Sequence, residues 1–145
     1  MAGKGFGFHR DVVNSELDIL VGGTIVATFS SDGGVTVANR NTTTVVQASN
    51  HQTGVTINGS GGTIQLFDVA LSAAAESQFT VTNSFVSAND VVILSIGDYN
   101  DGAGTPMYSV SDVSDGSFKI TISNPGAGDG YADDTTINFV VIKSV

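Results

Sequence analysis

The sequence predicts an all-β protein: an antiparallel β-sandwich preceded by an extended N-terminal arm and a β-hairpin. Only 13% of the 145 residues are charged, and the chain contains 18 glycines. Threonine and valine, which favour strands, are frequent, whereas lysine, leucine and glutamate, which usually fill helices, are scarce. Short apolar segments separated by turn residues recur from residue 62 onward. This spacing is typical of an antiparallel sandwich or a jelly roll.

Residues 1–15 are predicted to form the extended arm. This glycine-rich segment holds Phe6 and Phe8 together with the basic residues Lys4 and Arg10, and it also contains His9. Two arrangements are open. Either the arm folds back on its own domain, or it reaches a neighbouring subunit with the two phenylalanines as anchors and the two basic residues against an acidic surface.

Residues 16–29 read as a hairpin around Gly22-Gly23, a strong two-residue turn signal. Pairing Val21 with Thr24 would make both faces of this hairpin apolar. One face would carry Leu17, Ile19, Val21 and Val26, and the other Leu20, Ile25, Ala27 and Phe29. Because an isolated hairpin is marginal in water, we expect this one to be covered by something else.

The middle of the chain is polar and rich in turn residues. Residues 30–34 form a turn, residues 35–38 a short strand, residues 39–58 a polar extended segment, and residues 58–62 a glycine-rich break. The expected organisation is therefore an arm over residues 1–15, a hairpin with an extended polar segment over residues 16–58, and the β-sandwich over residues 59–145.

The sandwich strands are predicted at residues 62–69, 78–83, 90–96, 107–113, 116–123 and 135–142, with a loop or single helical turn at 71–77. The run at 90–96 is almost continuously apolar, which favours a central strand that is buried on both faces. Three other strands alternate. Their predicted inward residues are Phe79, Val81, Phe118, Ile120, Ile122, Ile137, Phe139 and Val141.

The charge and the absence of cysteine exclude several classes of protein. With a net charge of −9, the chain lacks the clustered lysine and arginine that nucleic acid requires. It has no apolar run long enough to form a transmembrane helix, and its N-terminus lacks the apolar core of a signal peptide. Without cysteine it can form neither disulfides nor thiolate metal sites. We therefore expect no nucleic-acid or membrane partner.

Two acidic, glycine-rich loops are the candidate metal sites. The possible calcium ligands are Asp98, Asn100, Asp101, Asp129, Asp133 and Asp134. Neither loop has the complete pattern of an EF-hand. Aspartate and glycine are also the residues that tight turns need, because glycine allows positive φ and aspartate bonds its own backbone. The sequence thus favours empty turns, with no metal and no cofactor.

No catalytic constellation emerges from the sequence. The two histidines are His9, in the arm, and His51, in a polar segment, and there is no nucleophile elbow. The two glutamates, Glu16 and Glu76, lie at strand edges, so paired carboxylates for glycoside hydrolysis are only a minor alternative. We expect the protein not to be an enzyme.

Several segments resemble a family of viral proteins. A C-terminal β-domain of tailed-bacteriophage virion proteins is similar to FTVTNSFVSANDVVILSI, YSVSDVSDGSFKITISN and the closing INFVVI. The front end of small phage decoration proteins is similar to NSELDILVGGTIVATF, DGGVTV and HQTGVTINGSGGTIQL. The resemblance covers most of residues 14–142 and consists of strand and turn patterns, without catalytic signatures.

This resemblance implies a trimeric jelly-roll sandwich without enzymatic activity. It points to a capsid decoration, or cement, protein that binds the assembled major capsid protein on the outer surface of the phage head after assembly in the host cytoplasm. The alternative is a tail-fibre or spike tip that binds host-surface glycans, but the short chain favours decoration. The arm and hairpin would form the capsid-facing base, with Lys4, Phe6, Phe8, His9 and Arg10 as candidate contacts.

Overall fold

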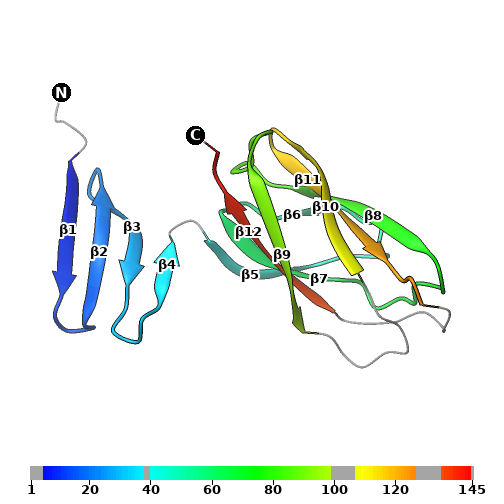
Figure 1. The fold of residues 1–145 in the computed structure, drawn as a ribbon, viewed down its shortest axis with the longest axis horizontal. Coiled ribbons are helices and arrows are strands. Elements are labelled where there is room, and N and C mark those ends of the chain that lie inside the picture. The colour runs from blue at the N-terminus through cyan, green and yellow to red at the C-terminus, as the bar shows by residue number, and fades with distance from the viewer. Residues whose placement is uncertain (1–4, 38–39, 99–106, 127–134, 145) are drawn as a thin grey trace. The chain divides into compact units, whose positions relative to one another are not determined.

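The computed structural model describes residues 5–37, 40–98, 107–126 and 135–144, and these residues form strands, turns and loops without any helix (Figure 1). The prediction of an all-β protein is therefore confirmed. The chain divides into two compact units, Met1–Arg40 and Asn41–Val145.

The N-terminal unit is one antiparallel sheet of four strands in the order β1-β2-β3-β4. The strands are β1 (Phe6–Asp11), β2 (Glu16–Val21), β3 (Thr24–Phe29) and β4 (Val35–Val37). The extended arm predicted over residues 1–15 is not a separate element, because β1 pairs with β2 along its whole length. Of the two arrangements left open by the sequence, this pairing matches the one in which the segment folds back on its own unit.

The β2–β3 hairpin turns at Gly22-Gly23 as predicted, and both glycines have positive φ (61° and 81°). Val21 pairs with Thr24, and Leu20 pairs with Ile25. The register then shifts, so that Ile19 pairs with Ala27 and the intervening residue of β3 forms a β-bulge. The bulge moves Ala27 and the residues after it to the other face. The predicted distribution of apolar residues over the two faces is therefore wrong for Ala27 and Phe29, whereas Leu20 and Ile25 share a face as predicted.

The second unit consists of two four-stranded sheets, with strand orders β10-β11-β8-β6 and β5-β7-β12-β9. Most pairs are antiparallel, and β6 pairs with β8 in parallel. The strands are β5 (Arg40–Val46), β6 (Val55–Thr56), β7 (Gly61–Gln65), β8 (Glu76–Thr82), β9 (Val91–Asp98), β10 (Met107–Ser114), β11 (Ser117–Ser123) and β12 (Thr136–Ile142).

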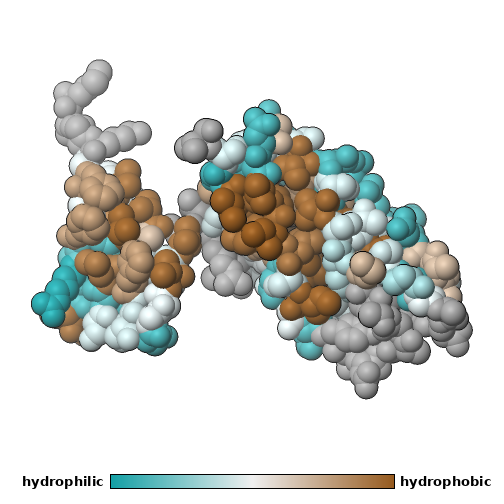
Figure 2. All heavy atoms as spheres, in the orientation of Figure 1, coloured by the Kyte–Doolittle hydropathy of each residue, from teal (hydrophilic) through white to brown (hydrophobic). Residues whose placement is uncertain are grey.

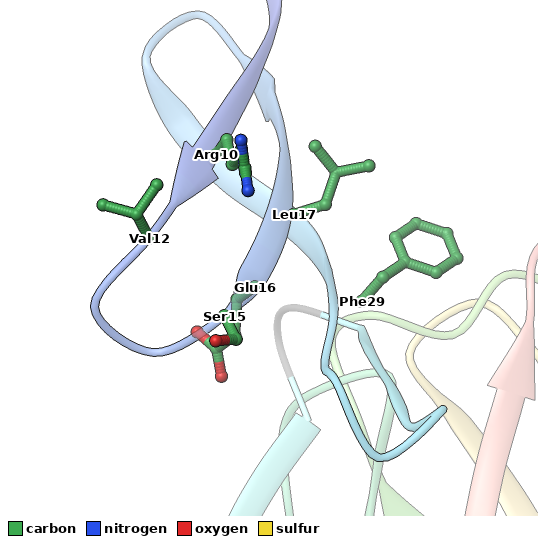
Figure 3. Close-up of a pocket in the computed structure, with 6 residues that line it drawn as sticks. All are labelled: Arg10, Val12, Ser15, Glu16, Leu17 and Phe29. Atoms are coloured by element: carbon green, nitrogen blue, oxygen red, sulfur yellow. The ribbon is translucent and has the colours of Figure 1, made fainter.

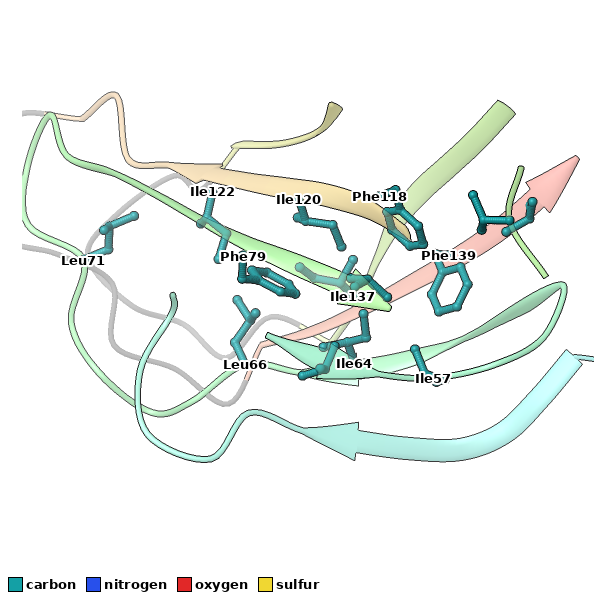
Figure 4. Close-up of a cluster of buried hydrophobic side chains, with 14 residues drawn as sticks. Ile57, Ile64, Leu66, Leu71, Phe79, Phe118, Ile120, Ile122, Ile137 and Phe139 are labelled. Atoms are coloured by element: carbon teal, nitrogen blue, oxygen red, sulfur yellow. The ribbon is translucent and has the colours of Figure 1, made fainter. Parts of the chain in front are cut away.

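The space between these two sheets is filled by a single apolar core (Figure 4). The ring centroids of Phe118 and Phe139 lie 5.4 Å apart within it. Every residue that the alternating strands predicted to face inward is buried. The buried apolar residues are Val55, Ile57, Ile64, Leu66, Leu71, Phe79, Val81, Val86, Phe118, Ile120, Ile122, Ile137, Phe139 and Val141. This arrangement makes the unit a β-sandwich.

The polar segment that follows the N-terminal sheet belongs to the sandwich. Its strands β5 and β6 pair within the two sheets, and Val55 and Ile57 lie in the core. Gln47 is buried, where its side-chain amide donates to the Thr53 carbonyl and accepts from the Phe67 amide. The boundary between the two units thus falls at residue 40, whereas the sequence pattern had placed the start of the sandwich at residue 59.

Strand β9 lies at the edge of its sheet, which contradicts the predicted central strand over residues 90–96. Val92 and Leu94 pack against the core, whereas Val91, Ile93 and Ile96 are about half exposed. The continuous apolar run is therefore not explained by burial on two faces of this unit.

Candidate interaction surface

One face of the N-terminal sheet is made almost entirely of apolar side chains. Cross-strand pairs place these residues together: Phe6 opposite Val21, Phe8 opposite Ile19, and Leu17 opposite Phe29. The same face continues onto β4 through the pairs Ala27–Val37 and Phe29–Val35. We call it the N-terminal apolar face, composed of Phe6, Phe8, Leu17, Ile19, Val21, Ala27, Phe29, Val35 and Val37.

The N-terminal apolar face is exposed in the isolated chain (Figure 2). Phe6 and Phe8 are 66% and 67% exposed, and their rings meet edge to face at 5.2 Å. Among the described residues of this unit, the one buried side chain is the carboxylate of Asp18, on the opposite face. The sheet therefore has no apolar core, and a continuous exposed apolar surface of this kind marks an interaction site.

The opposite face of the sheet is mainly polar, with Leu20 and Ile25 as one apolar cross-strand pair. Asp18 accepts a hydrogen bond from the Thr28 hydroxyl at 2.7 Å, and His9 Nδ1 lies 3.1 Å from its second oxygen. The Thr28 hydroxyl, followed by His9, lowers the pKa of Asp18. Asp11 and Glu16 pair on the same face. This side of the sheet can therefore face water while the other side binds a partner.

A depression of about 360 Å³ lies at one end of the sheet (Figure 3). Arg10 pairs with Leu17 across the two strands there, and Phe29 flanks Leu17. The lining residues are Arg10, Val12, Ser15, Glu16, Leu17 and Phe29. Arg10 places a guanidinium at the end of the apolar face. Leu17 and Phe29 give the depression apolar walls, and Arg10 and Glu16 give it one basic and one acidic group.

The structure separates the five contact residues proposed from sequence. Phe6, Phe8 and Arg10 share one face of β1, because alternate residues of a strand point the same way. His9 lies on the polar face beside Asp18. Lys4 lies outside the described residues. Val35 and Val37 also belong to this surface and were not predicted to do so, although their alternation with Thr36 indicates a strand with one apolar face.

The candidate calcium ligands fall mostly outside the described residues. Asp98 is exposed at the end of β9, and Asn100, Asp101, Asp129, Asp133 and Asp134 belong to the segments that the structure leaves undescribed. Within the described ranges, no group of three or more histidine, cysteine, aspartate or glutamate side chains is placed to hold a metal ion.

His51 is buried in the sandwich, although its sequence context is polar. It is only 3% exposed and belongs to the loop between β5 and β6. Gln47 Nε2 lies 3.5 Å from the His51 carbonyl oxygen. Burial lowers the pKa of the imidazole, while a hydrogen bond with the Phe67 backbone acts in the opposite direction. Its surroundings give this histidine a structural role.

Acidification below about pH 6.5, the ordinary pKa of histidine, is therefore expected to destabilise the sandwich. The folded state holds His51 neutral, so the unfolded state binds more protons and stability falls as the pH falls. Binding of one additional proton by the unfolded state changes the free energy of unfolding by at most about 1.4 kcal/mol per pH unit. The free energy of unfolding in urea is measured at pH 7.5 and at pH 5.5. It should change less between these two pH values for His51→Gln than for wild type. The same substitution at exposed His9 is the control, and an equal reduction there would contradict this assignment.

Asp90 and Lys143 close the C-terminal end of the sandwich. The Asp90 side chain is completely buried and lies 2.5 Å from Lys143 Nζ. It also accepts hydrogen bonds from the backbone amides of Ser87 and Ser144. The Lys143 hydrogen bond, with help from these amides, lowers the pKa of Asp90 to about 2. This cluster joins the end of β12 to the loop before β9.

Asp90→Asn is expected to lower the melting temperature at pH 7 by several degrees or more, because Lys143 loses its buried partner. A carboxylate whose pKa is lowered contributes stability above its ordinary pKa, and that contribution is lost as the pH falls toward 2. The difference in melting temperature between Asp90→Asn and wild type should thus become smaller between pH 4 and pH 2. Asp115→Asn, at an exposed carboxylate, should lower the melting temperature at pH 7 by less than Asp90→Asn does. A difference in melting temperature that stays constant down to pH 2 would show that the charged form of Asp90 does not stabilise the fold.

Comparisons with known protein families, with curated proteins and with solved structures gave no match. The described part of the chain contains no helix of the length and apolar character that crossing a membrane requires.

Proposed function

We propose that the chain is a virion structural protein, a capsid decoration protein of a tailed bacteriophage that binds the assembled major capsid protein and stabilises the head. The observation that carries this proposal is the N-terminal apolar face on a sheet without an apolar core. Such a sheet gains most of its stabilisation when another surface covers it. It suits an attachment element joined to a sandwich that has its own core.

The proposed mechanism is mass action. A protein that binds the assembled lattice but not the free capsid subunits shifts the equilibrium toward the assembled state. The apolar side chains would supply the buried area, and Arg10 would pair with an acidic group at the rim. A homotrimer would add avidity, because the second and third attachments are intramolecular.

In this proposal the N-terminal sheet, in place of an extended arm, is the capsid-facing base. The sandwich stays on the outer surface of the phage head, and assembly takes place in the host cytoplasm. The mechanism requires no catalysis, nucleic acid or cofactor. The jelly-roll connectivity implied by the resemblance stays a prediction, and the proposal depends only on a stable β-sandwich.

Phage particles that lack the protein provide the test. Full-length chain added back is expected to bind the heads and to raise the temperature at which they release DNA. A chain consisting of residues 41–145 keeps the entire described core and should stay folded without binding. Binding of this truncated chain at full affinity, or binding of the full chain to tails only, would overturn the proposal.

A glycan array separates this function from the fibre or spike alternative. A decoration protein should give no specific hit on host-surface glycans, whereas a receptor-binding tip should bind a defined subset. A saturable glycan hit that survives Phe8→Asp would count against decoration, because it would place the binding activity away from the N-terminal apolar face.

A further inference from the structure

A second apolar surface lies on the outer side of the sandwich. Cross-strand pairs place Ile93 opposite Val140 and Val91 opposite Ile142. All four side chains point away from the core and are between 45% and 56% exposed. Figure 2 shows apolar side chains gathered over β9 and β12. We call Val91, Ile93, Val140 and Ile142 the sandwich outer patch.

The sandwich outer patch carries no charge within it. Ser95 and Asn138 continue the same face as the next cross-strand pair, and Thr63 donates a hydrogen bond to Asn138 at 2.7 Å. The nearest charged side chains along the two strands stand at their ends. Asp98 lies at the far end of β9, and Lys143, just after Ile142, is held by Asp90.

We propose that the sandwich outer patch is the contact through which copies of this chain associate with one another. The chain has 14 acidic and 5 basic residues and a net charge of −9, so two copies repel each other over most of their surfaces. A surface that is apolar and free of carboxylates lets two copies meet without burying like charges. Because every copy presents the same patch, copies arranged around one symmetry axis can bring these patches together.

The position of β9 supports the same partner. It is an edge strand whose outward residues are as apolar as its inward ones, yet the sandwich leaves them half exposed. Burial against another copy accounts for the continuously apolar run at residues 91–94. This surface is separate from the N-terminal apolar face, so self-association and attachment to a particle use different residues. The inference adds this contact to the proposed function and rests on it only for the expected number of three copies.

Sedimentation velocity of the full-length chain over a range of micromolar concentrations tests the inference. Wild type is expected to associate, and Ile93→Lys should weaken association by at least about tenfold, equivalent to about 1.4 kcal/mol. Met107→Lys, at a residue of similar exposure on the other sheet, should associate like wild type. Val140→Lys repeats the test on β12, and circular dichroism verifies that each variant is folded.

A wild-type chain that stays monomeric at all these concentrations would overturn the inference. So would an Ile93→Lys variant that associates normally while a Phe8→Asp/Phe29→Asp variant dissociates, because the contact would then lie on the N-terminal apolar face. Binding of the protein to phage particles is measured in a separate assay. Loss of particle binding by the phenylalanine variant, with self-association intact, would support both assignments, whereas failure of the particle assay alone would affect only the proposed function.

Discussion

Phe118→Ala is expected to destabilise the sandwich by about 3–5 kcal/mol, which is a large fraction of the stability of an ordinary domain. Phe118 is fully buried, and its ring packs against Phe139 between the two sheets. Removing the ring loses its transfer free energy and leaves a cavity that the strands on either side cannot close. The affected core contains every buried apolar residue that the structure describes.

Urea unfolding followed by circular dichroism measures this effect, because the chain has no tryptophan to report by fluorescence. Phe118→Leu should lower the free energy of unfolding by less than Phe118→Ala does, since leucine keeps part of the volume of the phenylalanine side chain. Met107→Ala, at an exposed position, should change stability by no more than about 0.5 kcal/mol. If Phe118→Ala were as mild as Met107→Ala, the two sheets would not share the core described above.

Phe8→Asp/Phe29→Asp is expected to weaken binding of the protein to its particle by at least about 100-fold. Truncation of a buried aromatic anchor typically costs 2 kcal/mol or more, and every 1.4 kcal/mol is about tenfold in affinity. Both side chains are exposed in the isolated chain, so the substitutions should leave the sheet folded. Two carboxylates on the N-terminal apolar face would then have to be buried when the partner covers it.

The matched control is Thr36→Asp, which places a carboxylate on the opposite face of the same sheet. Cosedimentation with phage particles gives the affinity, and circular dichroism shows whether each variant is folded. Thr36→Asp should bind like wild type. Equal loss of binding for both substitutions would mean that charge anywhere on the unit disrupts attachment, which would refute the assignment of one face.

The alternation of apolar and polar residues was sufficient to predict most of the sandwich core. In β11, for example, Phe118, Ile120 and Ile122 alternate with polar residues because one face of the strand is buried and the other is not. This signal is local, so it needs no knowledge of the partner strands. For the same reason, the Gly22-Gly23 turn and the Val21–Thr24 pair could be predicted.

The N-terminal apolar face could not be derived from the same pattern. It depends on the bulge between β2 and β3, which exchanges the faces of Ala27 and Phe29 relative to regular pairing. A bulge reflects the fit of two strands and leaves little trace in either one. Likewise, Asp90 and Lys143 are 53 residues apart, and only the fold brings them together. The edge position of β9 was missed because an apolar run does not reveal which surface covers it.

Hydroxyl-radical footprinting, read by mass spectrometry, tests most directly whether the N-terminal apolar face is the attachment surface. The account predicts that Phe6, Phe8 and Phe29 are oxidised in the isolated chain and protected in the intact particle, while Met107 is oxidised in both. Equal oxidation of the three phenylalanines in the two states would contradict the central claim, because the face would then remain uncovered after assembly.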